Sequence, residues 1–167
     1  MKKWICLFAL PLLLIITTGC PYESEVPLDN PSVEIPATLP GTWAGLSDSG
    51  AVITITPLDR FSFLIQYNTK QEPVKLYTAF LSQIKNVQIL NLHPQQPETG
   101  LTAPYAFYKF ELTNDGTHIL LIPVTENIKE KFTSPTRQKK FFKKYILTSF
   151  FYDADEELEY EKIKPQK

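Results

Sequence analysis

The feature that most constrains the fold of this 167-residue chain is a series of short strand-like segments that recur about every ten residues. In the clearest of them, over 61–68, large apolar side chains alternate with mostly polar ones: Phe61, Phe63, Ile65 and Tyr67 against Ser62, Leu64, Gln66 and Asn68. A period of two places one set of side chains on the buried face of a strand. Comparable segments cover 51–56, 74–81, 87–92, 106–112 and 119–124. No helical pattern separates them, so they predict consecutive antiparallel strands.

After residue 124 the pattern changes from strands to a helix. Ser134 and Pro135 form a typical helix start, because a capping hydroxyl precedes a proline at the first helical position. At 100° per residue, an apolar side and a lysine side follow, which predicts an amphipathic helix over about 135–148. The apolar side holds Phe141, Phe142, Tyr145 and Ile146, and the opposite side holds Lys139, Lys140, Lys143 and Lys144.

An acidic stretch ends the chain, and its apolar residues Leu158, Tyr160 and Ile163 indicate one further strand. The predicted fold class is therefore mainly antiparallel β, covered by one C-terminal amphipathic helix. Two arrangements of the strands are open: a curved meander that wraps around the helix, and a closed barrel.

The first 20 residues form a segment of a different kind. Two lysines precede an uncharged apolar run over 4–16, and Thr17, Thr18, Gly19 and Cys20 follow it. This order is typical of a secretory signal. The alternative is an uncleaved membrane helix, but the run of 13 residues is shorter than the roughly 20 that span a bilayer.

These four residues resemble the lipobox of bacterial lipoproteins, in which Gly19 and Cys20 are the more specific positions. The resemblance implies that a diacylglycerol is attached to the Cys20 sulfur and that the signal peptide over 1–19 is removed. Two or three acyl chains would then hold the protein on a membrane without a spanning helix.

Residues 20–39 are expected to form a lipidated tether, because prolines favour extended backbone and acidic residues keep a linker solvated. The segment contains Pro21, Pro27, Pro31 and Pro36 with Glu23, Glu25, Asp29 and Glu34 between them. The sequence over 20–29 resembles the mature start of small lipoproteins common in the Bacteroidetes. That resemblance implies an anchor on the outer membrane, at the periplasmic face or at the cell surface. A single β-rich domain is expected over 40–167.

The residue inventory excludes several functions. After loss of residues 1–19, 15 basic residues stand against 18 acidic ones, so binding to nucleic acid is not expected. Cys6 would leave with the signal and Cys20 would be lipidated, which leaves no thiol. His93 and His118 lack the spacing of metal ligands, and the acidic segment over 153–157 lacks the turn glycine of a calcium loop. We predict no catalytic residue, no metal site and no cofactor.

One further motif bears on ligand binding. The expected domain opens with Gly41, Thr42 and Trp43. This Gly-x-Trp order resembles the opening of lipocalins and of lipocalin-like lipoproteins, and the order of meander, helix and final strand is similar as well. The resemblance implies that Trp43 closes one end of a lipocalin-like barrel or borders a ligand. The alternative is a buried core tryptophan at the start of a strand.

Three functions are compatible with these observations. The first is a lipid-anchored, non-catalytic binding or interaction module of the cell envelope, with an envelope protein as its partner. The second is a lipocalin-like carrier of a small apolar ligand. The third is an envelope hydrolase, because paired carboxylates meet in space rather than in sequence. A filled barrel favours the module, a wide empty barrel favours the carrier, and a cleft with two converging acids favours the hydrolase.

Overall fold

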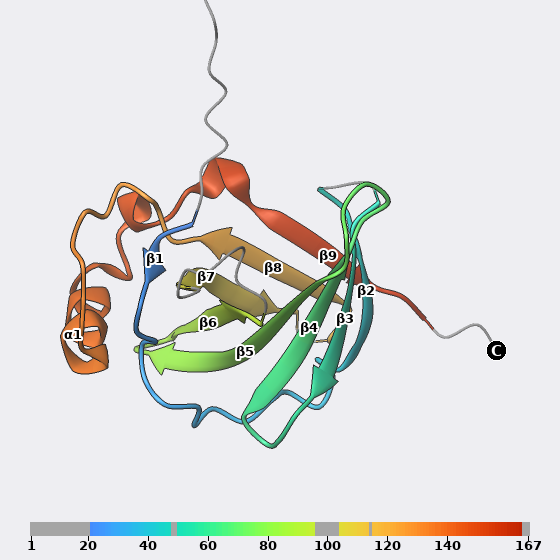
Figure 1. Ribbon diagram of the computed structural model, residues 1–167, viewed down its shortest axis with the longest axis horizontal. Helices are drawn as coiled ribbons and strands as arrows, with labels where there is room; N and C mark the ends of the chain where they lie inside the picture. Colours follow the sequence, from blue (N-terminus) through green and yellow to red (C-terminus); the bar gives the residue numbers. More distant parts are fainter. Residues whose placement is uncertain (1–20, 48–49, 96–103, 114, 165–167) are drawn as a thin grey trace, which may run out of the picture.

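The computed structural model describes residues 21–47, 50–95, 104–113 and 115–164. Within them the chain forms a closed barrel of eight antiparallel strands with one α-helix outside it (Figure 1). The barrel strands are β2 (Gly41–Gly45), β3 (Val52–Pro57), β4 (Ser62–Asn68), β5 (Lys75–Ile84), β6 (Val87–Pro94), β7 (Tyr105–Leu112), β8 (His118–Pro123) and β9 (Leu158–Lys162). The predicted fold class is confirmed, and of the two arrangements left open the barrel is correct.

The barrel closes through its last strand. From β2 to β8, strands that follow each other in sequence are antiparallel neighbours, and β9 pairs with both β8 and β2. Tyr160 lies opposite Ile119 of β8 on one side and opposite Gly45 of β2 on the other. Closure removes the two exposed edges that an open meander would have.

Large side chains fill the barrel interior. Every second residue of the strands points inward, and the inward set forms one hydrophobic cluster. Its core consists of Leu39, Trp43, Ile53, Ile55, Phe63, Ile65, Ala79, Leu81, Leu90, Phe110, Ile119, Leu121 and Tyr160. Trp43, Phe63 and Leu81 are at most 1% exposed, so the middle of the barrel is packed.

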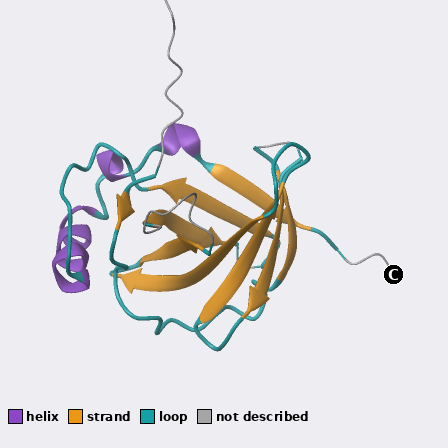
Figure 2. Ribbon diagram, in the orientation of Figure 1, coloured by secondary structure: helices purple, strands orange, loops and turns teal. Residues whose placement is uncertain are grey.

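The helix α1 (Pro135–Tyr145) packs against the outer surface of the barrel rather than inside the sheet (Figure 2). Phe142 and Ile146 are buried in a second cluster with Ile89 and Phe107 of the barrel wall. Ser134 occupies the cap position, as predicted, but its side chain makes no capping hydrogen bond. The helix ends before residue 148, and two short 3₁₀ turns, η1 (Ser149–Phe151) and η2 (Ala154–Glu156), lead into β9.

The expected tether is not a free linker in the structure. Residues 21–40, here called the N-terminal strap, lie along the barrel, and β1 (Glu23–Ser24) pairs with the start of β7 (Figure 1). Tyr22, Leu28 and Leu39 are at most 2% exposed. Burial of these side chains offsets the cost of ordering a proline-rich segment whose conformational freedom is already low. The domain therefore begins at residue 21 rather than at 40.

Polar contacts fix the course of the strap. The Leu28 amide donates to Asn91 Oδ1 of β6 over 3.0 Å, and Asp29 accepts from Ser82 of β5 and pairs with Lys139 of α1. Farther along, the Ile35 amide donates over 3.1 Å to the backbone oxygen of Arg60, in the turn between β3 and β4. The strap thus joins the helix to the barrel wall and then passes across the barrel end where β2 begins.

Because Tyr22 is buried, its phenol is expected to titrate at a higher pH than an exposed tyrosine does. Burial raises the pKa of the phenol from 10 to about 12, and the Glu130 carboxylate contributes in the same direction. The folded state favours the neutral phenol, so Tyr22 contributes stability that is complete below pH 10 and is lost as the pH rises through about 12. NMR titration of isotope-labelled tyrosine, with Tyr22→Phe to assign the signal, should give a midpoint near 12. A midpoint at the ordinary value would mean that the strap is not packed.

Candidate functional site

Trp43 is part of the packed interior. Its side chain is 0% exposed, and its Nε1 donates to the Leu39 backbone oxygen over 3.1 Å. The ammonium of Lys162 lies 5.0 Å from the centre of its ring, within the range of a cation–π interaction. Trp43 therefore stands at the barrel end that the strap crosses, in contact with protein groups. The lipobox residues Thr17, Thr18, Gly19 and Cys20 lie outside the described residues.

The opposite end of the barrel has a different lining. Tyr67, Tyr77, Leu92 and Tyr108 are half-buried there and pack against the interior cluster.

The candidate functional site is a groove of about 780 Å³ in the barrel wall, where β7 continues beyond its pairing with β6. Its lining includes side chains of the outer face and also Phe110 and Leu112, which belong to the interior cluster or pack against it. Three segments form the groove: the hairpin between β5 and β6, the second half of β7, and the turn after α1.

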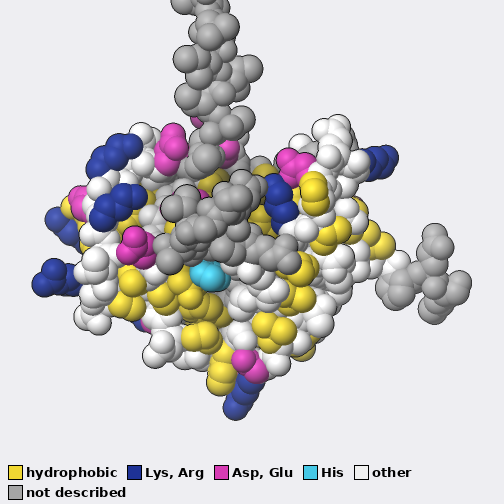
Figure 3. All heavy atoms as spheres, in the orientation of Figure 1, with side chains coloured by type: hydrophobic (Ala, Val, Ile, Leu, Met, Phe, Trp, Pro, Cys, Tyr) yellow, Lys and Arg dark blue, Asp and Glu magenta, His cyan; other side chains and the backbone are white. Residues whose placement is uncertain are grey.

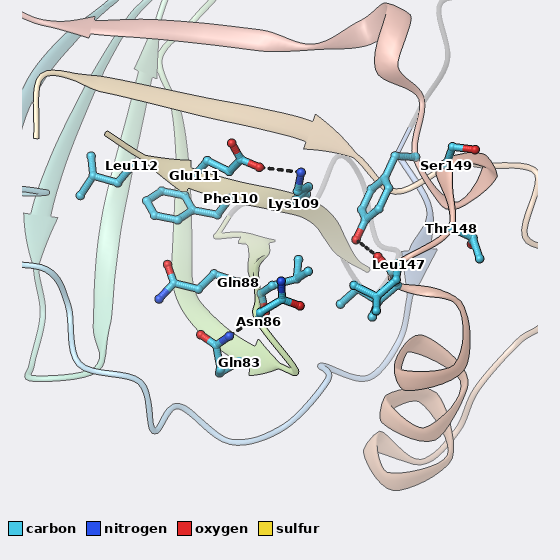
Figure 4. A pocket seen from close by; sticks show the side chains of 13 residues that line it. Gln83, Asn86, Gln88, Lys109, Phe110, Glu111, Leu112, Leu147, Thr148 and Ser149 are labelled. Atoms are coloured by element: carbon cyan, nitrogen blue, oxygen red, sulfur yellow. Dashed lines mark hydrogen bonds and ion pairs between the residues drawn. The ribbon is translucent and has the colours of Figure 1, made fainter. Parts of the chain in front are cut away.

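Figure 4 shows Gln83, Asn86 and Gln88 on the hairpin side and Leu147 pointing toward them from the turn after α1. The Thr148 and Ser149 side chains point away from the hairpin, and the Thr148 hydroxyl donates to the Tyr145 backbone oxygen. Val87, Phe110, Leu112, Ile146 and Tyr152 complete the lining together with Lys109 and Glu111.

An ion pair lies in the groove wall. Lys109 and Glu111, both on the outer face of β7, approach to 2.5 Å (Figure 4). The Lys109 ammonium is also 5.9 Å from the centre of the Tyr152 ring. The Tyr152 hydroxyl donates to the Ile146 backbone oxygen over 2.8 Å and so fixes the turn after α1 against the barrel. Burial, with a smaller contribution from the Glu111 carboxylate, raises the pKa of Tyr152 well above its usual range, so this hydroxyl remains a donor.

The lining determines what the groove can bind. Carboxamide side chains both donate and accept hydrogen bonds, and the groove has three of them together with apolar residues such as Val87 and Leu147. This combination suits a ligand with apolar surface and several hydrogen-bonding groups, such as a glycan or a peptide segment. No sequence pattern pointed to it, because its three segments meet only in the folded chain.

A second, smaller pocket of about 390 Å³ lies beside η2. Four carboxyl groups line it, those of Glu126, Asp153, Asp155 and Glu156. Across the described ranges, no group of three or more His, Cys, Asp or Glu side chains has an arrangement that could hold a metal ion. The segment compared with a calcium loop forms the 3₁₀ turn η2 instead.

The two histidines lie on different strands and have separate neighbours. The His93 ring, on β6, packs 4.5 Å from the ring of Tyr105. His118 Nδ1, on β8, is 2.9 Å from the Thr117 hydroxyl. These contacts give each histidine a local packing or hydrogen-bonding role.

No family model matches the chain, and no significant match is found among curated proteins or solved structures. The fold by itself is consistent with a lipocalin-like barrel accompanied by one helix. Of the helices in the described ranges, none combines the length and the apolar composition required to cross a membrane.

Proposed function

We propose that this protein is a non-catalytic binding module of the cell envelope, anchored to the outer membrane by lipid on Cys20, which binds its ligand in the groove between β7 and the turn after α1. The observation that carries the proposal is the contrast between the filled barrel interior and the open groove. The barrel interior is occupied by Trp43, Phe63 and Leu81, whereas the groove offers about 780 Å³ with a mixed lining.

Within the groove, the arrangement of charges favours binding over hydrolysis, whereas the carboxyl groups that a hydrolase would pair lie in the separate pocket beside η2. Glycoside hydrolysis uses two carboxyl groups that flank the scissile bond. The described groove lining contains one, Glu111, and that carboxylate is paired with Lys109. A neutralised carboxylate beside carboxamides can orient a ligand through hydrogen bonds but has no partner acid.

The lipocalin-like carrier is the alternative, and three tyrosines indicate where its ligand would lie. Tyr67 of β4, Tyr77 of β5 and Tyr108 of β7 are half-buried toward the barrel end opposite Trp43. An apolar ligand held there would rest on the packed core rather than fill the barrel. The two functions thus place the ligand on different residues, and one experiment separates them.

Resonance mapping tests the binding site. Envelope extracts, separated into glycan, peptide and lipid fractions, are added to the isotope-labelled chain that begins at Pro21. We expect one fraction to shift the backbone resonances of Val87, Lys109 and Thr148. Asn86→Trp, which places a large ring in the groove, should weaken binding at least tenfold, a loss of about 1.4 kcal/mol or more. The control Leu58→Trp, at a position that is 52% exposed on the β3–β4 turn, should bind normally.

Other outcomes of the mapping decide between the functions. Shifts confined to Tyr67, Tyr77 and Tyr108 would replace the groove by the carrier site. Equal binding by Asn86→Trp and the wild type, with shifts elsewhere, would contradict the assignment to the groove.

A further inference from the structure

A row of aromatic side chains follows the outer side of α1 and is incompletely covered. Phe132, Phe141, Tyr145 and Phe150 form a chain of ring contacts, with successive centroid distances of 5.3, 4.7 and 6.1 Å. The first three rings are half-buried, while Phe150 is 67% exposed and the nearby Leu147 is 60% exposed. These are the two most exposed large hydrophobic side chains in the described part of the chain. Together these five residues are called the aromatic patch.

Basic residues are concentrated in the segment that carries the aromatic patch, although the protein as a whole is acidic. Between residues 129 and 144 there are seven Lys and Arg residues and one acid, Glu130, whereas the rest of the chain after Cys20 has eight basic and seventeen acidic residues. Figure 3 shows Lys and Arg side chains gathered on the side of the molecule where α1 lies. The Lys144 ammonium is 4.8 Å from the centre of the Tyr145 ring, so charge and aromatic surface are contiguous.

The start of the strap lies beside this patch. Pro21 forms an antiparallel bridge with Thr125, and the Thr125 amide donates to the backbone oxygen of Phe151 over 3.1 Å. Two inter-strand spacings, roughly 10 Å, therefore separate Pro21 from the residue that follows Phe150. The C-terminal end of the chain leaves on the side away from α1 (Figure 1).

We infer that the aromatic patch and its lysines form a second membrane contact, which binds the surface of an anionic phospholipid bilayer. The inference rests on the proposed lipid on Cys20, since Cys20 directly precedes Pro21 in the sequence. Because the strap is packed instead of free, a lipid at that point holds this side of the domain against the bilayer. Aromatic and aliphatic side chains with lysines around them suit the interfacial region of a membrane.

Anionic lipid fits the charge of this surface better than neutral lipid does. Each lysine near an anionic membrane favours binding by about 1 kcal/mol, which is roughly a fivefold change in partition. The attraction weakens beyond a Debye length of about 8 Å at physiological ionic strength. The contact would orient the domain with the groove beside the bilayer, since Leu147 belongs to both the patch and the groove lining.

Quenching by brominated lipid tests this contact. The Phe150→Trp variant, expressed as the full chain and extracted from membranes, is reconstituted into vesicles of phosphatidylethanolamine and phosphatidylglycerol that carry brominated acyl chains. We expect strong quenching of the introduced tryptophan and little quenching in the matched control Leu58→Trp. Trp43 is buried and contributes equally to both variants. Adding Lys144→Ala, which removes the charge beside the Tyr145 ring, should lower the ratio of protein with the patch on the bilayer to protein with the patch off it by roughly fivefold.

Each remaining result supports or overturns the contact. Weaker quenching in pure phosphatidylcholine vesicles, or in about 1 M salt, where the Debye length is about 3 Å, would support the role of charge. If the protein floats with the vesicles but Phe150→Trp is quenched no more than Leu58→Trp, the anchor stands and the second contact is wrong. If mass spectrometry finds no lipid on Cys20, the proposed anchor is wrong. The same two variants, mixed with the vesicles, then test the membrane contact by itself. Stronger quenching of Phe150→Trp than of Leu58→Trp supports the contact, and equal quenching of the two variants overturns it.

Discussion

Cys20→Ser is expected to abolish attachment of lipid to the protein. The proposed anchor is a thioether, which requires a sulfur nucleophile, and the serine hydroxyl does not replace it. Cells grown with an alkyne-tagged fatty acid should label the wild-type protein and leave the variant at background. Unprocessed precursor should accumulate at the same time, because removal of residues 1–19 follows lipidation in the lipoproteins that the lipobox resembles.

The chain provides a matched control in its other cysteine. Cys6→Ser makes the same chemical change within the segment that we expect to be removed. It should retain full labelling and normal processing. Labelling of Cys20→Ser at the wild-type level would contradict the lipid anchor.

Phe142→Ala is expected to lower the free energy of unfolding of the domain strongly. Phe142 is 0% exposed and joins three segments: its ring lies 6.2 Å from Tyr22 of the strap, 5.4 Å from Phe107 of β7 and 5.0 Å from Phe151 of η1. Truncation of a buried phenylalanine costs about 3–5 kcal/mol through lost burial and the cavity that remains. Urea denaturation of the chain that begins at Pro21 measures the loss.

Phe150→Ala is the matched control for that measurement. It removes the same ring from a position that is 67% exposed, so the free energy of unfolding in the absence of lipid should change by no more than about 0.5 kcal/mol. A loss below about 1 kcal/mol for Phe142→Ala would mean that α1 is not a structural part of the domain.

The strands and the helix could be predicted from the sequence because their signals are local. Period-two alternation located β3 and β4. The helical period of α1 separated an apolar side from a lysine side. The period did not indicate which apolar residues are buried most deeply. In the structure Phe142 and Ile146 are buried, whereas Phe141 and Tyr145 are half-buried.

The strap was mistaken for a tether because its buried residues follow no period. Tyr22, Leu28 and Leu39 are separated by six and then eleven residues. Tyr22 and Leu28 pack in the cluster beside α1, whereas Leu39 packs in the barrel interior. Prolines are compatible with such a strap, since an extended segment with few strand partners needs few backbone donors. The signal that could have indicated a packed strap was the presence of large apolar residues in a segment predicted to be exposed to solvent.

The closing strand and the groove depend on contacts between distant parts of the chain. Tyr160 of β9 pairs with Gly45 of β2, more than a hundred residues earlier, and no local pattern specifies such a pair. Likewise Asn86, Lys109 and Thr148 are each more than twenty residues from the next. They line one groove only because the barrel wall and the turn after α1 meet, which explains why the sequence pointed to Trp43 instead.

Mass spectrometry of the N-terminal peptide, from protein extracted out of native membranes, tests the proposed anchor most directly. The peptide is expected to begin at Cys20 and to carry a diacylglycerol on its sulfur. The following residues should resist proteases in the intact protein, because the strap from Pro21 onward is packed on the barrel. A peptide that begins at Met1, or one with an unmodified Cys20 thiol, would contradict the anchor and with it the proposed place of this module in the envelope.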